Sequence, residues 1–136
     1  MKKYLSRDRL KNYSLIEING LVMFSLEYCK NKLGINKRKK KELTYGIYNG
    51  DISNECYGYY DPDEHEIIVM LKQNKTIKDI VGLICHEYTH SLQPCKSQYT
   101  KLLNKYGYDD HPFEMEAISN EYIFKEILRE YRKKLV

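Results

Sequence analysis

The segment from Thr76 to Gln93 constrains the fold more than any other part of the sequence. Thr76 with Asp79 resembles a capping box, with Asp in place of the usual Glu or Gln, and Pro94 ends the segment. Apolar residues recur between these signals at the three- and four-residue steps of one helix face: Ile77, Ile80, Val81, Ile84, Tyr88 and Leu92. The pattern predicts a helix that is buried along one side.

This helix also carries His86-Glu87-Tyr88-Thr89-His90, an H-E-x-x-H motif. Residues four apart share a helix face, so both imidazoles can reach one ion, and Glu87 can flank the metal without binding it. There Glu87 can take a proton from metal-bound water. The spacing predicts a Zn²⁺ site at His86 and His90 with Glu87 as general base. Two solvated surface histidines are the alternative, although chance produces this motif in about one such sequence in a hundred.

Periodicity and turn residues predict the other elements and a single α+β domain over residues 1–136. Residues 66–71 are nearly continuously apolar, which indicates a strand covered on at least one face. We expect a helix over 14–33, a strand over 43–49, a turn at Asn49 to Asp51, strands within 56–61 and 66–71 joined by a turn at Asp61 to Glu64, a short helix over 99–106, and a last helix over 113–133. About three neighbouring strands predict one small, mostly antiparallel sheet.

Two histidines do not complete a catalytic zinc site, which needs a third protein ligand and an open fourth position. The extended form H-E-x-x-H-x-x-G-x-x-H is absent, because Gln93 occupies the position of its glycine and Lys96 occupies the position of its third histidine. A carboxylate from a later helix is the other source of a ligand. The segment HPFEMEAISNEY, residues 111–122, offers two candidates, Glu114 and Glu116.

The stretch EAISN, Glu116 to Asn120, resembles the third-ligand segment of thermolysin-like gluzincins, and HEYTHSLQ with HPFEMEA is similar to minimal gluzincin domains of phage and mobile-element proteins. The resemblance covers residues 84–122 and the strand before them. It implies a zincin-like zinc metallopeptidase with Glu116 as third ligand on the C-terminal helix. Asn120 stands where the family has an acidic residue that orients the first histidine. Glu114 competes with Glu116, and two residues of separation point them to different helix faces.

The resemblance leaves the oxyanion-stabilising residue open, because no histidine follows His111 in this chain. Tyr106, Tyr108 and His111 precede the third ligand, and we take Tyr108 and His111 as catalytic candidates. Packing or surface roles are the alternative for each, and His111 can instead cap the last helix. The strand at 66–71 is expected at the sheet edge beside the cleft, where an extended peptide or protein substrate can pair with it.

The remaining signals concern location and partners. The first residues lack the apolar core of a signal peptide, and no run approaches 18 apolar residues, so we expect a cytoplasmic protein without a membrane span. Its cysteines have no C-x-x-C spacing and are expected to be reduced thiols, with Cys85 packed in its helix: Cys29, Cys56, Cys85 and Cys95.

The net charge of +4 owes much to the basic run NKRKKK, residues 36–41. A solvated loop between a helix and a strand is the favoured interpretation, because no aromatic residues interleave the run. A nucleic-acid-associated protein is the alternative. Two further alternatives keep the metal: a non-catalytic zinc-containing binding or inhibitory protein, and hydrolysis of a non-peptide amide such as a cell-wall crosslink. The sequence indicates no oligomeric state.

Overall fold

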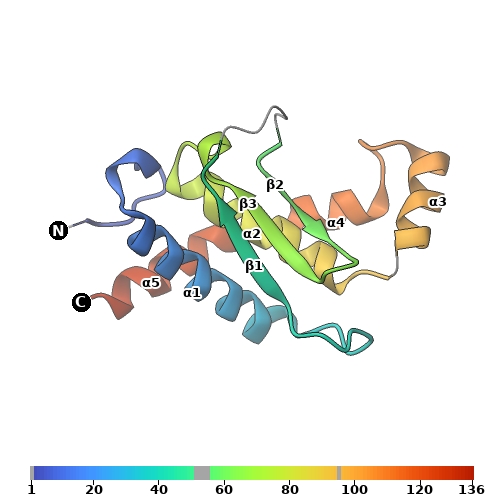
Figure 1. Ribbon diagram of the computed structural model, residues 1–136, viewed down its shortest axis with the longest axis horizontal. Coiled ribbons are helices and arrows are strands. Elements are labelled where there is room, and N and C mark those ends of the chain that lie inside the picture. Colours follow the sequence, from blue (N-terminus) through green and yellow to red (C-terminus); the bar gives the residue numbers. More distant parts are fainter. Residues whose placement is uncertain (1, 51–55, 95) are drawn as a thin grey trace.

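The computed structural model describes residues 2–50, 56–94 and 96–136 and has an α+β architecture. Figure 1 shows the helices behind a small sheet, with α3 set apart at one end of the molecule. The elements are η1 (Leu10–Asn12), α1 (Leu15–Leu33), β1 (Thr44–Tyr48), β2 (Gly58–Asp61), β3 (Glu66–Met70), η2 (Leu71–Gln73), α2 (Ile77–Leu92), α3 (Lys96–Tyr106), α4 (Pro112–Asn120) and α5 (Ile123–Lys134).

Side-chain caps fix the starts of the two longest helices. Ser14 and Glu17 form a complete capping box at α1, and Thr76 and Asp79 form one at α2. Gly34 ends α1 with φ of 83°, a left-handed value that glycine adopts without strain. The predicted bounds of both helices are therefore confirmed to within a residue or two.

The sheet corrects the expectation of a mostly antiparallel arrangement. Its strand order is β1-β3-β2, with β1 parallel to β3 and β2 antiparallel to it. The expected edge strand at 66–71 is wrong as well, because β3 is central and β2 forms the edge nearest α2. The apolar run Ile67 to Met70 is buried throughout, as suits a strand that has neighbours on both sides. The expected turn at Asn49 to Asp51 lies partly outside the described residues.

One core joins the sheet to α1, α2 and α5. Side chains from β3 and the three helices pack together in it: Ile67, Val69, Leu21, Val22, Ile80, Ile84, Ile127 and Leu128. Cys29 and Cys85 are buried free thiols of this core, so the packing role expected for Cys85 is confirmed. Cys56 is also free, and Cys95 lies outside the described residues. Among the described helices, none has the length and apolar character needed to cross a bilayer.

The expected last helix at 113–133 is two helices, which corrects the prediction. At the break, the backbone N–H of Glu121 bonds to the carbonyl of Ile118, and that of Phe124 bonds to the carbonyl of Glu121. These i→i−3 bonds tighten the chain by comparison with an α-helix. The tightened turn lets α4 pack on α2 near the motif, while α5 packs on α1 and α2.

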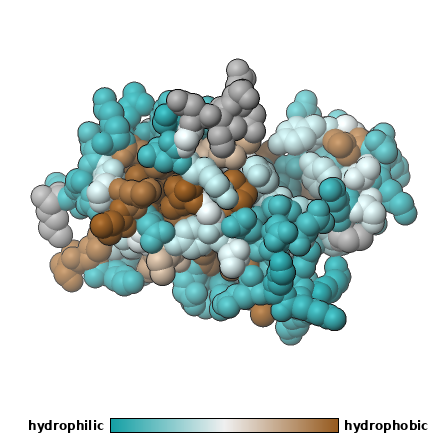
Figure 2. Space-filling view, viewed as in Figure 1, coloured by the Kyte–Doolittle hydropathy of each residue, from teal (hydrophilic) through white to brown (hydrophobic). Residues whose placement is uncertain are grey.

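The basic run occupies the loop between α1 and β1, as its solvated interpretation predicted. Figure 2 shows hydrophilic side chains over this loop at the lower right of the view. Two side chains of the loop bond to backbone carbonyls elsewhere in the protein, and Lys41 forms an ion pair with Glu64. The side-chain amide of Asn36 donates to the carbonyl of Ser91, and the ammonium of Lys39 donates to that of Pro62.

Candidate metal centre

Three ligand atoms converge between α2 and α4. The Nε2 atoms of His86 and His90 are 3.2 Å apart, and each lies 3.1 Å from Oε1 of Glu114. The histidines share a face because they are one turn apart on α2. Glu114 belongs to the first turn of α4 and is 4% exposed. Within the described residues, this trio is the group of His, Cys, Asp and Glu side chains that could hold a metal ion.

A hydrogen bond at Nδ1 of each imidazole fixes the orientation of the ring. Nε2 is therefore the nitrogen that faces the other two ligand atoms. Nδ1 of His86 donates to Glu121 Oε2 at 2.8 Å, and Nδ1 of His90 donates to Gln93 Oε1 at 2.7 Å. Because each Nδ1 carries a hydrogen, each neutral ring presents a lone pair at Nε2. Such partners behind metal-binding histidines set the tautomer and the ring orientation.

The trio fits a divalent cation such as zinc. Two imidazole nitrogens and one carboxylate oxygen are ligands of catalytic zinc, and tetrahedral bonds of roughly 2.0–2.1 Å place ligand atoms about 3.3 Å apart. Without a metal the cluster attracts protons instead. Burial lowers the pKa of His86, but hydrogen bonds to Glu114 and Glu121 outweigh it and raise the pKa to about 9. Burial acts to raise the pKa of Glu114, but its hydrogen bonds, chiefly to the two histidines, hold it well below its usual range.

The carboxylate at the trio is Glu114, which corrects the expectation for Glu116. Glu116 is exposed and accepts a hydrogen bond of 2.8 Å from Nε2 of Gln93. Residues two apart on a helix point about 200° apart, so only one of these glutamates can face α2. Asn120 does not orient His86 either: its amide donates to Oγ1 of Thr89, and Glu121 holds the imidazole.

Glu87 lies beside the trio without joining it, as its place in the motif predicted. Its Oε2 is 4.0 Å from Nε2 of His86, and the residue is 8% exposed. Burial raises the pKa of Glu87 to about 7, against the opposing effect of the two histidines. The nearby backbone of Tyr60 in β2 also acts to lower the pKa.

Two tyrosines supply hydroxyls to the site. Tyr99 of α3 donates to Oε2 of Glu114, a contact that no sequence pattern indicated, because α3 and α4 meet only in the fold. Tyr108, a sequence candidate, lies in the connection between α3 and α4 and is 58% exposed. Burial of its hydroxyl, followed by the negative charges of Glu114 and Glu87, raises the pKa of Tyr108.

His111 is a structural residue, which corrects its place among the catalytic candidates. It is completely buried, and both ring nitrogens bond to the backbone. Nδ1 accepts from the N–H of Phe113 at 3.0 Å, which caps α4, and Nε2 donates to the carbonyl of Tyr99 at 2.9 Å. The ring also stacks on Tyr99 with centroids 4.0 Å apart. His111 therefore holds α3 against α4, the capping alternative raised from the sequence.

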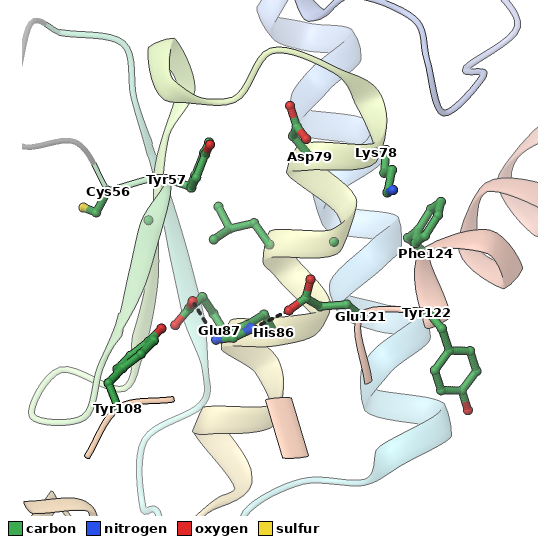
Figure 3. A pocket seen from close by; sticks show the side chains of 13 residues that line it. Cys56, Tyr57, Lys78, Asp79, His86, Glu87, Tyr108, Glu121, Tyr122 and Phe124 are labelled. Atoms are coloured by element: carbon green, nitrogen blue, oxygen red, sulfur yellow. Dashed lines mark hydrogen bonds and ion pairs between the residues drawn. The ribbon is translucent and has the colours of Figure 1, made fainter. Parts of the chain in front are cut away.

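Two cavities meet at the motif, and both are lined by Gly58, His86, Glu87 and Tyr108. One, of about 630 Å³, opens toward the start of α2 and is drawn in Figure 3. The other, of about 360 Å³, opens toward α3 and is lined also by His90, Tyr99 and Glu114. A cleft thus runs past the candidate metal centre beside the edge strand β2.

Comparison of the chain with protein-family models, curated proteins and solved structures finds no match.

Proposed function

We propose that this protein is a zinc-dependent, gluzincin-like peptidase that hydrolyses a peptide bond with Glu87 as general base. The observation that carries the proposal is the convergence of His86, His90 and Glu114, with the Glu87 carboxylate 4.0 Å from His86 Nε2 in an open cleft. His86, His90 and Glu114 would hold the zinc. The motif helix beside a small sheet, with a later helix that brings the third ligand, agrees with a zincin-like minimal fold.

Bound zinc supplies Lewis acidity, which polarises a carbonyl group and acidifies water. Glu87 accepts a proton from the attacking water and later delivers it to the leaving amine. Tyr108, whose side chain lines both cavities, donates its hydroxyl hydrogen to the carbonyl oxygen as negative charge develops there.

Within the described residues no further strand pairs with the outer edge of β2, and this edge supports a peptide or protein substrate. The carbonyl of Tyr57 accepts from Met70 in β3, so the alternate residues Gly58 and Tyr60 direct their backbone groups away from β3. The N–H of Tyr60 lies toward the Glu87 carboxylate. The N–H and carbonyl of Gly58 and the carbonyl of Tyr60 therefore lie along the cleft for an extended chain to pair with.

A non-catalytic zinc protein is the main rival. Structural zinc sites are usually closed by four protein ligands, whereas catalytic sites have three and leave one position open. The described residues bring three ligands together, and two cavities adjoin them. This combination favours catalysis.

The test replaces Glu87 with Gln, which keeps the size of the side chain and removes its basicity. Zinc content measured by elemental analysis should stay at about one per chain, while hydrolysis of a diverse peptide mixture should fall roughly 10²–10⁴-fold. Glu27→Gln, an exposed change on α1, is the matched control and should keep full activity. Retained hydrolysis in Glu87→Gln would exclude Glu87 as the base. A zinc-loaded wild type that cleaves no peptide would favour the non-catalytic rival.

A further inference from the structure

The sheet has a second outer edge, on β1, which lies on the opposite side of β3 from β2. β1 pairs with β3 along one edge, and within the described residues no strand pairs with its other edge. Its sequence TYGIY contains no charged residue and no proline, with which proteins commonly protect an open edge. The strand is therefore available for pairing with another extended chain.

The pairing with β3 shows which backbone groups of β1 point outward. The N–H of Thr44 donates to the carbonyl of His65, just before β3. Alternate residues of a parallel pair bond to the same neighbour, so Thr44 and every second residue after it bond to β3. The N–H and carbonyl groups of Tyr45 and Ile47 consequently point away from β3. An added strand would meet donors and acceptors from both residues there.

Two cavities lie at the two ends of this strand, between it and α1. One, of about 600 Å³, is lined by Tyr45 near the start of β1 and by Met23 of α1. The other, of about 460 Å³, is lined by Asn49 just after β1 and by Leu15 at the start of α1. Helix α1 therefore runs alongside β1 in the opposite direction (Figure 1). The hydroxyl of Tyr45 donates to Oδ1 of Asn19 at 2.7 Å, which holds the two elements together.

The apolar walls of both cavities suit the side chains of an extended peptide. Leu15 is 53% exposed and Met23 is 55% exposed, so both apolar groups lie open to a ligand. Figure 2 shows apolar side chains over the start of α1 and beside β1. The helix rises about 12 Å from Leu15 to Met23, a length that about four residues of extended chain cover. One segment can therefore place alternate side chains in both cavities.

The rims of the two cavities are positively charged. Four lysines line the cavity at the start of β1, against the carboxylates of Glu27 and Glu42: Lys30, Lys39, Lys40 and Lys41. Arg9, Lys11 and Lys75 line the cavity at the end of β1, and no carboxylate of the described part of the chain does so. Carboxylates of a bound segment would thus meet complementary charge at both ends of the strand.

We propose that the outer edge of β1 docks an extended acidic segment of a partner protein. The segment adds a strand to the sheet, places aliphatic side chains in the two cavities and sets its carboxylates against the basic rims. This docking site uses no residue of the candidate metal centre, so it is independent of the proposed peptidase function.

Two other occupants fit the edge less well. Pairing of two β1 edges in a dimer would bring the basic rims of both copies together, and like charges repel. A nucleic acid has no backbone amides for strand pairing and needs exposed rings for base stacking. The tyrosines that line the cavities are buried or half-buried instead: Tyr13, Tyr45 and Tyr88.

Fluorescence anisotropy tests the proposal with the labelled peptide Glu-Glu-Thr-Ile-Thr-Val-Thr-Glu-Glu, and a second peptide has lysine in place of each glutamate. We expect wild type to bind the acidic peptide at least about tenfold more tightly than the basic one, because the rims repel like charge. Lys11→Glu combined with Lys40→Glu changes one residue of each cavity and should weaken the acidic peptide about tenfold. Lys101→Glu combined with Lys105→Glu, on exposed positions of α3, is the control of equal net charge and should bind like wild type.

Ile47→Pro tests the strand pairing itself. Proline removes the N–H of residue 47, which points away from β3, so the pairing of β1 with β3 keeps its hydrogen bonds. Ile47→Ala loses the same side chain but keeps the N–H, and it is the matched control. We expect Ile47→Pro to bind the acidic peptide about tenfold more weakly than Ile47→Ala, because a backbone hydrogen bond is lost. Urea unfolding verifies that both variants fold, and the charge variants test the proposal if Ile47→Pro does not.

Absence of binding by the acidic peptide, or equal affinity for the basic one, would overturn the proposal. Binding that none of these variants changes would place the peptide elsewhere, such as on β2, and would also overturn it. A wild-type dimer in sedimentation that dissociates in Ile47→Pro would assign the edge to a second copy instead. Tighter binding of a single-stranded oligonucleotide, lost with Lys11→Glu and Lys40→Glu but kept in Ile47→Pro, would assign the surface to nucleic acid instead.

Discussion

Tyr99 holds one oxygen of Glu114, and the other oxygen of that carboxylate faces the two histidines of the motif. The hydroxyl of Tyr99 donates to Oε2, while Oε1 lies 3.1 Å from Nε2 of His86 and of His90. These contacts at both oxygens fix the orientation of the Glu114 carboxylate. Glu114, rather than Glu116, is therefore the carboxylate oriented toward the candidate metal centre.

Glu114→Ala should lower zinc content well below the one ion per chain expected of wild type, because it removes one of three ligands. Glu116→Ala should keep its zinc, since that side chain is exposed and bonds to Gln93. Elemental analysis of protein purified without an affinity tag provides the measurement, with His86→Ala as the control for a broken site. Loss of zinc in Glu116→Ala together with retention of zinc in Glu114→Ala would show that Glu116, rather than Glu114, is the third ligand.

Glu121→Ala should weaken zinc binding about 10–100-fold, because the imidazole of His86 loses the acceptor that orients it. Glu121→Gln keeps an acceptor oxygen and should lose less. Competition with a chromophoric chelator measures the affinity. Glu126→Ala, which removes an ion pair with Lys32 on another surface, is the matched control and should bind like wild type. Equal affinity in all three variants would mean that Glu121 does not support the site.

The stability of the protein should depend on His65 as the pH falls through the ordinary histidine pKa of about 6.5. Burial, followed by the nearby charge of Lys39, lowers the pKa of this imidazole in the folded state. As the pH falls below the ordinary value near 6.5, the unfolded chain takes up a proton that the folded chain resists. The free energy of unfolding should therefore decrease toward acid.

His65→Asn should remove this part of the pH dependence. Asparagine tolerates the left-handed φ of 52° at this position, so the backbone can keep its conformation. Urea unfolding at several pH values compares the variant with wild type, and the difference between the two curves isolates His65 from the other titrating groups. If the free energies of unfolding of the variant and of wild type change in parallel with pH, the pKa of His65 is the same in the folded and unfolded states.

Gly58 of β2 and Gly82 of α2 line the same cavity, and they should respond oppositely to alanine. Gly58→Ala should cost about 1–3 kcal/mol of unfolding free energy, because its Cβ collides with the backbone of β3. Gly82→Ala should gain about 0.5–1 kcal/mol from helix propensity. Urea denaturation of both variants measures the two free energies of unfolding. A destabilised Gly82→Ala variant would show that a methyl group does not fit beside residue 82.

Local signals in the sequence account for what could be predicted. The cap at Thr76 and the period of α2 each act within a few residues, so this helix and the face that carries the motif follow from them. The strand at Glu66 to Met70 is likewise evident from its apolar run.

Features that depend on distant partners could not be predicted. The parallel pairing of β1 with β3 depends on which strand β1 meets in the fold, which the turn expected at Asn49 to Asp51 does not specify. Glu114 and Glu116 are equivalent locally, and only the rotation of α4 against α2 distinguishes them. The contact of Tyr99 with Glu114 depends in the same way on how α3 docks.

The way α3 is attached bears on two separate properties of the proposed zinc protein: how long it holds an ion and how well it resists denaturation. None of its side chains is fully buried, and it is joined to the site through Tyr99 and through the bond from His111 to the Tyr99 carbonyl. Elements with so little buried surface open locally at low cost, without unfolding of the core. Each such opening takes Tyr99 away and releases the carboxylate of Glu114. If the proposed site binds an ion, we expect the residence time of that ion to follow excursions of this one helix, whereas resistance to denaturation should follow the core of β3, α1, α2 and α5.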